Sequence, residues 1–83
     1  MTPIQLKARL ETLAQGTSAE VNDLTGTLDH YQAVVVSPVF EGKLMIEQHR
    51  MVYKLLQVEI DSNEVHALTL KTYTPKQYEA IKA

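Results

Sequence analysis

The strand predicted at residues 30–37 constrains this chain more than any other feature, because it requires a neighbour on each edge. The stretch reads HYQAVVVS, and Val34, Val35 and Val36 place apolar β-branched side chains on both faces of the strand. Pro38 ends it, since proline has no N–H to donate to a sheet. The strand is therefore expected in the middle of a sheet.

Two other runs of sequence predict the neighbouring strands. Residues 19–24, AEVNDL, indicate a weak strand, and the turn-like TGTLD at 25–29 leads from it into the central strand. Residues 65–73, VHALTLKTY, alternate in polarity and indicate a third strand after the loop DSNE at 61–64. The predicted sheet has three strands.

Two short motifs mark the starts of helices. Residues 2–5, TPIQ, combine a capping hydroxyl, a proline at the first helical position and a glutamine that can reach back to the cap. The first helix is expected over residues 3–14, because Gly16 can take the left-handed conformation that ends a helix. Residues 74–77, TPKQ, repeat the arrangement and predict a last helix.

A long helical stretch is predicted at residues 43–60, after a turn at 40–43 (FEGK). Its apolar residues recur at spacings near the helical period of 3.6 residues. They form the predicted core face: Leu44, Met45, Met51, Val52, Leu55, Leu56 and Ile60. This face is expected to pack on the sheet.

The order of these elements predicts an α+β fold in which helices pack on one face of a three-stranded sheet. The chain has 83 residues, which is enough for one core, so residues 1–83 are expected to form a single domain. A net charge of -2 gives no strong attraction to nucleic acid or to an anionic membrane. No apolar run approaches the length of a bilayer span, so a cytoplasmic location is the default expectation.

The absence of cysteine limits the chemistry of this chain. Without thiols there is no disulfide, no thiol catalysis and no metal centre whose thiolates come from this chain. The residues also show no phosphate-binding loop, dinucleotide-binding glycine pattern, nucleophile elbow or paired carboxylates, so no enzymatic activity is expected.

His66 is the most informative of the three histidines. It has the same strand parity as Leu68 and Leu70, and a half-buried histidine with one hydrogen bond is the commoner explanation of such a position. A metal ligand would need a second group nearby. His30, at the start of the central strand, can reach His66 only if the two strand ends lie close together. His49, on the helical stretch, is interpreted as a surface or packing histidine.

Residues 34–56 and 65–78 together resemble the BolA family. The specific elements are the Ser-Pro-x-Phe-Glu-Gly-Lys turn at 37–43, His-Arg-x-Val-Tyr at 49–53 and His-Ala-Leu-x-Leu-Lys-Thr-x-Thr-Pro at 66–75. The resemblance implies an αββααβα arrangement similar to the class II KH fold, with the long helical stretch broken into a short helix and a longer one. The Gly-x-x-Gly loop of KH domains has no counterpart here, which argues against KH-type clamping of single strands.

The resemblance also implies a partner and a cofactor. BolA-like proteins form heterodimers with monothiol glutaredoxins, and the pair can hold a bridging [2Fe-2S] cluster. The glutaredoxin cysteine and a glutathione thiol serve one iron, and two side chains of the BolA-like protein serve the other. His66 corresponds to the family histidine, and His30 is the only histidine near the loop that carries the second ligand. No cluster is expected in the isolated protein, which would be a monomer or weak homodimer without membrane contact.

A second function implied by the resemblance is DNA binding. Some BolA-like proteins are transcriptional regulators of stress response and cell morphology, and here a KH-like surface would bind DNA. The glycine turn exposes backbone N–H groups beside cations that can contact phosphates. The surface predicted to contact a partner or nucleic acid comprises Phe40, Glu41, Gly42, Lys43, Arg50 and Lys71.

Overall fold

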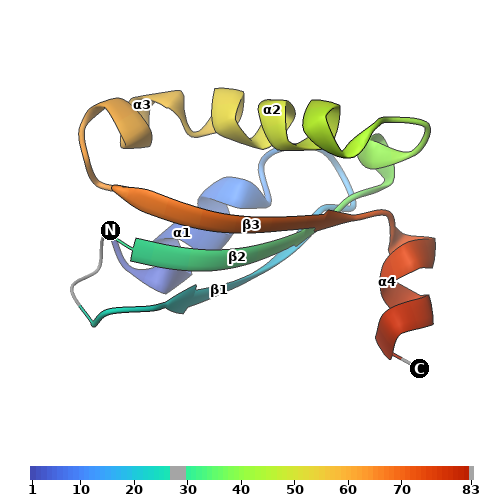
Figure 1. The fold of residues 1–83 in the computed structure, drawn as a ribbon, viewed down its shortest axis with the longest axis horizontal. Helices are drawn as coiled ribbons and strands as arrows, with labels where there is room; N and C mark the ends of the chain where they lie inside the picture. The colour runs from blue at the N-terminus through green and yellow to red at the C-terminus, as the bar shows by residue number, and fades with distance from the viewer. Residues whose placement is uncertain (27–29, 83) are drawn as a thin grey trace.

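The computed structural model describes residues 1–26 and 30–82, and it confirms the α+β fold class. The predicted turn at 25–29 is described only as far as Gly26. Figure 1 shows α2 and α3 above the sheet, α1 behind it and α4 beyond the end of β3. The elements are α1 (Pro3–Leu10), β1 (Ser18–Asp23), β2 (His30–Val36), the short 3-10 helix η1 (Pro38–Phe40), α2 (Met45–Leu55), α3 (Gln57–Asp61), β3 (Ala67–Tyr73) and α4 (Pro75–Lys82).

The sheet has the order β1-β2-β3, so the valine-rich strand is central as predicted. β1 runs antiparallel to β2, whereas β3 runs parallel to it. In the parallel pair His30 lies opposite Ala67, and Val36 lies opposite Tyr73. The amino ends of β2 and β3 therefore meet at the same end of the sheet.

The core lies between the sheet and three of the helices. Alternate residues of β2, namely Tyr31, Ala33 and Val35, are completely buried on this face. Complete burial of one large apolar side chain stabilises a fold by roughly 1.5–3 kcal/mol. The core residues are Leu6, Leu10, Ala19, Tyr31, Ala33, Val35, Phe40, Val52, Leu56, Val65 and Leu70.

Both predicted capping motifs are present. The N–H of Gln5 donates to the Thr2 hydroxyl oxygen (3.1 Å), and the N–H of Thr2 donates to the Gln5 side chain (2.9 Å). At α4 the N–H of Gln77 donates to the Thr74 hydroxyl oxygen (3.2 Å), and the Gln77 side chain accepts from the Thr74 N–H. Because each cap involves residues only three apart, the local sequence was sufficient to predict it.

The first helix ends at Leu10, so the prediction that it extends to residue 14 is wrong. The Thr12 hydroxyl donates to the Arg9 carbonyl oxygen (2.6 Å), and the Thr12 N–H donates to the same oxygen (3.2 Å). This pattern replaces the next turn of α-helix, since a threonine hydroxyl competes for backbone acceptors. Gly16 follows with a positive φ of 84°, within the turn that leads to β1.

The long helical stretch is interrupted at Leu56, as the family resemblance implied. The longer helix, α2, comes first and the five-residue α3 follows. No glycine or proline causes the break. Instead, the Arg9 guanidinium of α1 donates through Nη2 to the Leu55 carbonyl oxygen (2.8 Å) and through Nε to Glu59 Oε1 (3.1 Å). A helix carbonyl is thereby used for a tertiary contact at the junction.

The predicted core face of this stretch is correct in its middle and wrong at its start. Val52 and Leu56 are completely buried, but Leu44 is 69% exposed and Met45 is 68% exposed. Leu44 is the N-cap residue of α2. The first buried residue of α2 is Gln48, four positions before Val52, and Met45 precedes Gln48 by about one helical turn.

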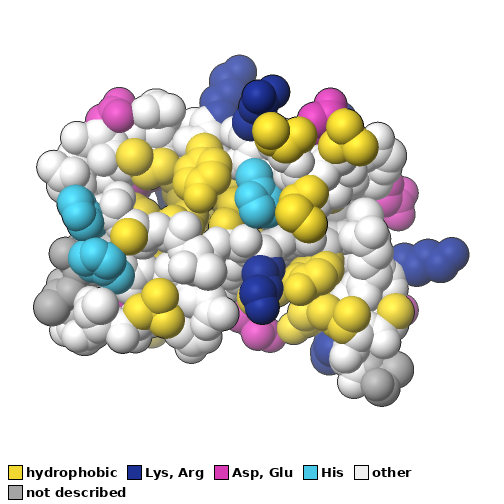
Figure 2. Space-filling model, viewed as in Figure 1, with side chains coloured by type: hydrophobic (Ala, Val, Ile, Leu, Met, Phe, Trp, Pro, Cys, Tyr) yellow, Lys and Arg dark blue, Asp and Glu magenta, His cyan; other side chains and the backbone are white. Residues whose placement is uncertain are grey.

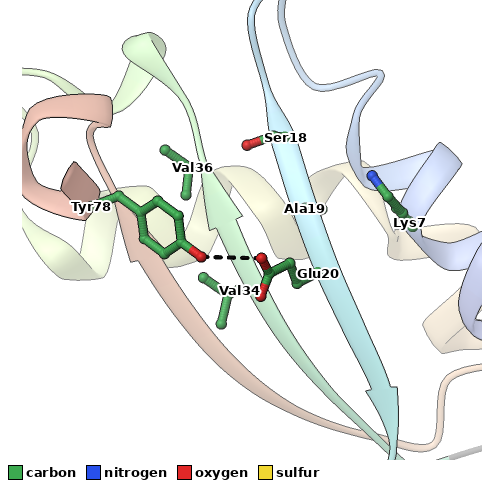
Figure 3. Close-up of a pocket in the computed structure, with 7 residues that line it drawn as sticks. All are labelled: Lys7, Ser18, Ala19, Glu20, Val34, Val36 and Tyr78. Atoms are coloured by element: carbon green, nitrogen blue, oxygen red, sulfur yellow. Dashed lines mark hydrogen bonds between the residues drawn. The ribbon is translucent and has the colours of Figure 1, made fainter. Parts of the chain in front are cut away.

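The C-terminal helix α4 lies near the opposite face of the sheet from α2 (Figure 1). Figure 3 shows Tyr78 beside Val34 and Val36 of β2, with its hydroxyl directed at Glu20 of β1. The hydroxyl donates to Glu20 Oε1 (3.1 Å). This hydrogen bond, together with burial and the negative charge of Glu20, raises the pKa of Tyr78. In the part of the chain described here, no helix is long and apolar enough to cross a bilayer.

Candidate metal centre and neighbouring surfaces

His30 and His66 lie side by side at the shared amino ends of β2 and β3. His30 is the first residue of β2, and His66 directly precedes the first residue of β3. Their ring centres are 5.2 Å apart, with an angle of 62° between the ring planes. Figure 2 shows histidine side chains gathered at one end of the molecule. The sequence predicted a common site only if these strand ends were close, and the parallel pairing brings them together.

The separation of the two rings fits joint binding of one metal ion. Two imidazoles that each bind a tetrahedral ion at about 2.0–2.1 Å have ring centres roughly 5 Å apart. His66 is exposed and His30 is half-buried, so a partner can approach the pair from outside. In residues 1–26 and 30–82, no group of three His, Cys, Asp or Glu side chains is arranged to hold a metal ion. The pair could supply two ligands of a shared site.

The backbone on each side of the pair is anchored. Before His66, the N–H of buried Val65 donates to the Glu59 carbonyl oxygen (3.1 Å). Beside His30, its own carbonyl oxygen accepts from the Leu24 N–H (2.8 Å) at the base of the hairpin. These bonds hold both chain segments in place, so the backbone that carries the two imidazoles is fixed at this end of the sheet.

The predicted contact surface at residues 40–43 needs one correction. Phe40 is completely buried in the core, so it cannot contact a partner or nucleic acid. Its burial follows from η1, which turns the chain inward after Ser37 and Pro38. Glu41, Gly42 and Lys43 are exposed, and Gly42 has a positive φ of 75°, which favours glycine.

The other predicted contact residues, Arg50 and Lys71, are exposed on α2 and β3. His49 is half-buried on α2 and lines a groove together with Met45, Leu70 and Lys71. It does not belong to the pair formed by His30 and His66. Two of the three histidines therefore lie at the amino ends of β2 and β3, and the third lies on α2.

Gln48 positions the exposed turn, a role that was not predicted from the sequence. Its side-chain amide donates to the carbonyl oxygens of Phe40 (3.2 Å) and Lys43 (2.9 Å). Its Oε1 accepts from the Thr72 hydroxyl (2.7 Å), so the turn is joined to β3. One signal was present in the sequence. Gln48 is a polar residue four positions before Val52, where the apolar stripe predicts a buried side chain.

An open apolar groove lies between the start of α2 and α4. It was not predicted from the sequence. It has a volume of about 620 Å³. Figure 2 shows exposed hydrophobic side chains toward the end of the molecule opposite the paired histidines. The groove is lined by Lys43, Leu44, Met45, Gln48, Thr72, Tyr73, Gln77, Ala80 and Ile81.

Comparison with known families identifies the fold. The sequence model of the family described as BolA-like protein matches residues 2–77. The chain belongs to the BolA-like family. The match includes the two strands that present His30 and His66, and it also includes the whole of α2. The resemblance stated from the sequence motifs is thereby confirmed.

Individual relatives of this BolA-like chain carry different names. It is 38% identical over 80 residues to Protein BOLA2 of Arabidopsis thaliana, a match covering 94% of this chain and 84% of the relative. It is 42% identical over 57 residues to the DNA-binding transcriptional regulator BolA of Escherichia coli, covering 69% of this chain and 53% of the relative. The match thus spans about half the length of that regulator.

A solved structure supports the same fold. The structure of a bolA protein homologue from Coxiella burnetii is 39% identical to this BolA-like chain and superposes with a TM-score of 0.76. The comparison covers 95% of this chain and 97% of the other. The order of helices and strands described above is therefore the BolA arrangement.

Proposed function

We propose that this BolA-like chain is a non-enzymatic adaptor that pairs with a monothiol glutaredoxin and shares a bridging [2Fe-2S] cluster with it. The observation that carries the proposal is the 5.2 Å separation between the rings of His30 and His66. The role would lie in iron–sulfur trafficking or in iron and redox regulation. The cluster would be shared with glutathione as well as with the glutaredoxin.

A partner is required by the donor groups. Two imidazoles and the two bridging sulfides would complete one iron of a [2Fe-2S] cluster, but the chain has no cysteine to hold the second iron. Thiolates from the glutaredoxin and glutathione would hold that second iron. The exposure of His66 supports this arrangement, because a shared ligand must lie at the contact between two molecules.

The residues of this chain would act by holding ligands rather than by turnover. His30 and His66 would each direct an unprotonated ring nitrogen at the same iron, so acid is expected to weaken binding. The hydrogen-bonded backbone at Val65 and at His30 holds the strand ends that carry the two rings. A cluster held partly by histidine has a higher reduction potential than one held by cysteines alone. The adaptor would thus alter the state of the partner's cluster.

Reconstitution with a monothiol glutaredoxin, glutathione, iron and sulfide tests this proposal. Wild type is expected to give visible absorption and circular dichroism spectra different from those of the glutaredoxin alone. His66→Ala should abolish the difference, and His30→Ala should change it. His49→Ala is the matched control, because its ring lies on α2 outside the pair. Wild-type spectra from both His66→Ala and His30→Ala would overturn the proposal.

DNA binding is a second candidate function, favoured by the name of the Escherichia coli relative. Lys43, Arg50 and Lys71 are exposed and could contact phosphates. Titration of duplex DNA binding with salt separates the two functions. Sequence-specific binding that survives physiological salt and is lost in Lys43→Ala or Arg50→Ala would support a regulator. Binding that salt abolishes would indicate only weak, non-specific contacts.

A further inference from the structure

The outer edge of β3 carries backbone groups that face away from β2. The Tyr73 carbonyl oxygen accepts from the Ser37 N–H (3.1 Å), so the backbone of Tyr73 faces β2. Because the N–H and C=O groups of successive residues alternate in direction, those of Leu68, Leu70 and Thr72 face the other way. Among the described strands, β2 alone pairs with β3, and it does so along the inner edge of β3. The outer edge of β3 has no partner strand in the described part of the chain.

A groove runs beside this edge. Its volume is about 250 Å³, and it is lined by Met45, His49, Leu70, Lys71, Thr72 and Tyr73. Met45, Thr72 and Tyr73 also line the 620 Å³ groove between α2 and α4. The two grooves are therefore neighbours along the second half of β3. Exposed apolar side chains of Met45 and Ile81 stand along them.

We propose that the outer edge of β3 and these grooves bind an extended, acidic and apolar peptide segment of a partner protein, which adds to the sheet as a fourth strand. An extended chain supplies the donors and acceptors that match the outward backbone groups of Leu70 and Thr72. Side chains two residues apart in the peptide lie about 6.6–7 Å from each other and point the same way. Alternate apolar side chains can thus enter the grooves beside Met45.

The charges along the edge select the kind of peptide. Lys71 lies on β3 and Lys43 lines the larger groove, whereas β3 carries no acidic residue. Glu47 lines neither groove, and its carboxylate accepts from the Leu44 N–H (2.8 Å). Acidic residues of a peptide would therefore meet cations. A lysine on an edge strand opposes pairing between two copies of the same chain, which favours a different partner.

This site is separate from the histidine pair and does not rest on the proposed function. His66 precedes the first residue of β3, whereas the grooves begin at Leu70 and continue past Tyr73. Leu70 lies four residues after His66, which corresponds to roughly 13 Å along the strand. A peptide paired with Leu70 and Thr72 would leave the imidazoles exposed.

Selection of peptides from a random phage-displayed library tests the proposal. The wild-type chain is the target, and a Met45→Glu and Lys71→Glu double variant removes unrelated binders beforehand. Peptides of about ten residues that alternate apolar and acidic positions should be enriched. Their affinity should fall on the order of tenfold or more in each single variant. Lys76→Glu, an exposed lysine of α4 outside both grooves, should bind as wild type does.

N-methylation of the selected peptide tests the backbone pairing. Methyl groups on alternate nitrogens of one parity should abolish binding, whereas those of the other parity should leave it nearly unchanged. Equal binding by both methylated forms would overturn the fourth-strand model, as would a library that yields no binder. Binding of a short oligothymidylate that depends on Lys71 would assign the edge to nucleic acid instead. A concentration-dependent dimer abolished by Met45→Glu would assign it to a second copy. Circular dichroism of each variant establishes that it is folded.

Discussion

At the scale of single residues, Gln48 shows how one buried amide fixes the shape of an exposed turn. Its side chain contacts the carbonyl oxygens of Phe40 and Lys43 and the hydroxyl of Thr72. The exposed residues 41–43 are thereby held at a constant distance from β3. The geometry of this surface depends on a residue that is itself only 6% exposed.

We expect Gln48→Leu to lower the free energy of unfolding by about 1–3 kcal/mol, because buried acceptors lose their donor. Urea denaturation followed by circular dichroism measures the change. Gln57→Leu is the matched control, since Gln57 is exposed and its amide donates to Asp61 on the surface of α3. Equal losses in the two variants would show that the amide contacts of Gln48 contribute little.

At the scale of elements, α1 is joined to the break between α2 and α3 by hydrogen bonds from Arg9. The Arg9 guanidinium binds Leu55 and Glu59, which are 46 and 50 residues away in the sequence. Glu59 is buried, and its Oε1 contacts the Arg9 guanidinium at 3.1 Å. The contact joins the first helix to the junction between the second and third.

Replacing Arg9 by Met is expected to destabilise the fold by about 1–3 kcal/mol, because the buried Glu59 carboxylate loses its cation. Chemical denaturation should show part of this loss recovered when Glu59→Gln is added. Lys7→Met removes an exposed ion pair with Glu11 and should cost less than about 1 kcal/mol. Additive effects of Arg9→Met and Glu59→Gln would contradict the coupling.

Elements and caps were predictable from sequence where their causes are local. The caps of α1 and α4 involve residues three apart, and the central position of β2 follows from its valines. The family motifs implied a break within residues 43–60, but periodicity could not, because the apolar spacing continues through Leu56 to Ile60. The exposure of Met45 and the burial of Phe40 also depend on how distant segments pack. For His30 and His66, the sequence identified both residues but not the parallel pairing that joins them.

At the scale of the whole molecule, Tyr78 connects the last helix to the first strand. Its hydroxyl donates to Glu20, which is 58 residues away. α4 has no buried residue of its own, so this contact is important in holding it near the sheet. α4 is thus joined to β1 across the face of the sheet that carries Val34 and Val36 (Figure 3).

The raised pKa of Tyr78 predicts a loss of stability in alkali. As pH rises above about 10, an unfolded tyrosine releases its proton before the folded one does, which favours unfolding. The contribution is complete below that pH and disappears as the pH passes through the folded pKa. The excess Tm of wild type over Tyr78→Phe should therefore shrink in alkali. Tyr53→Phe, at an exposed tyrosine of α2, is the control. A Tm difference that is constant with pH would contradict this prediction.

The two imidazoles lie outside the core, so the metal binding proposed for them would be separate from folding. His66 is exposed and His30 is half-buried, while the strands that carry them are held by Tyr31, Val35 and Leu70. Substitutions at the two histidines would therefore change what the chain can bind while the same sheet persists. Proteins that descend from one ancestor with this fold can therefore change their ligands by two mutations, because neither mutation unfolds the sheet.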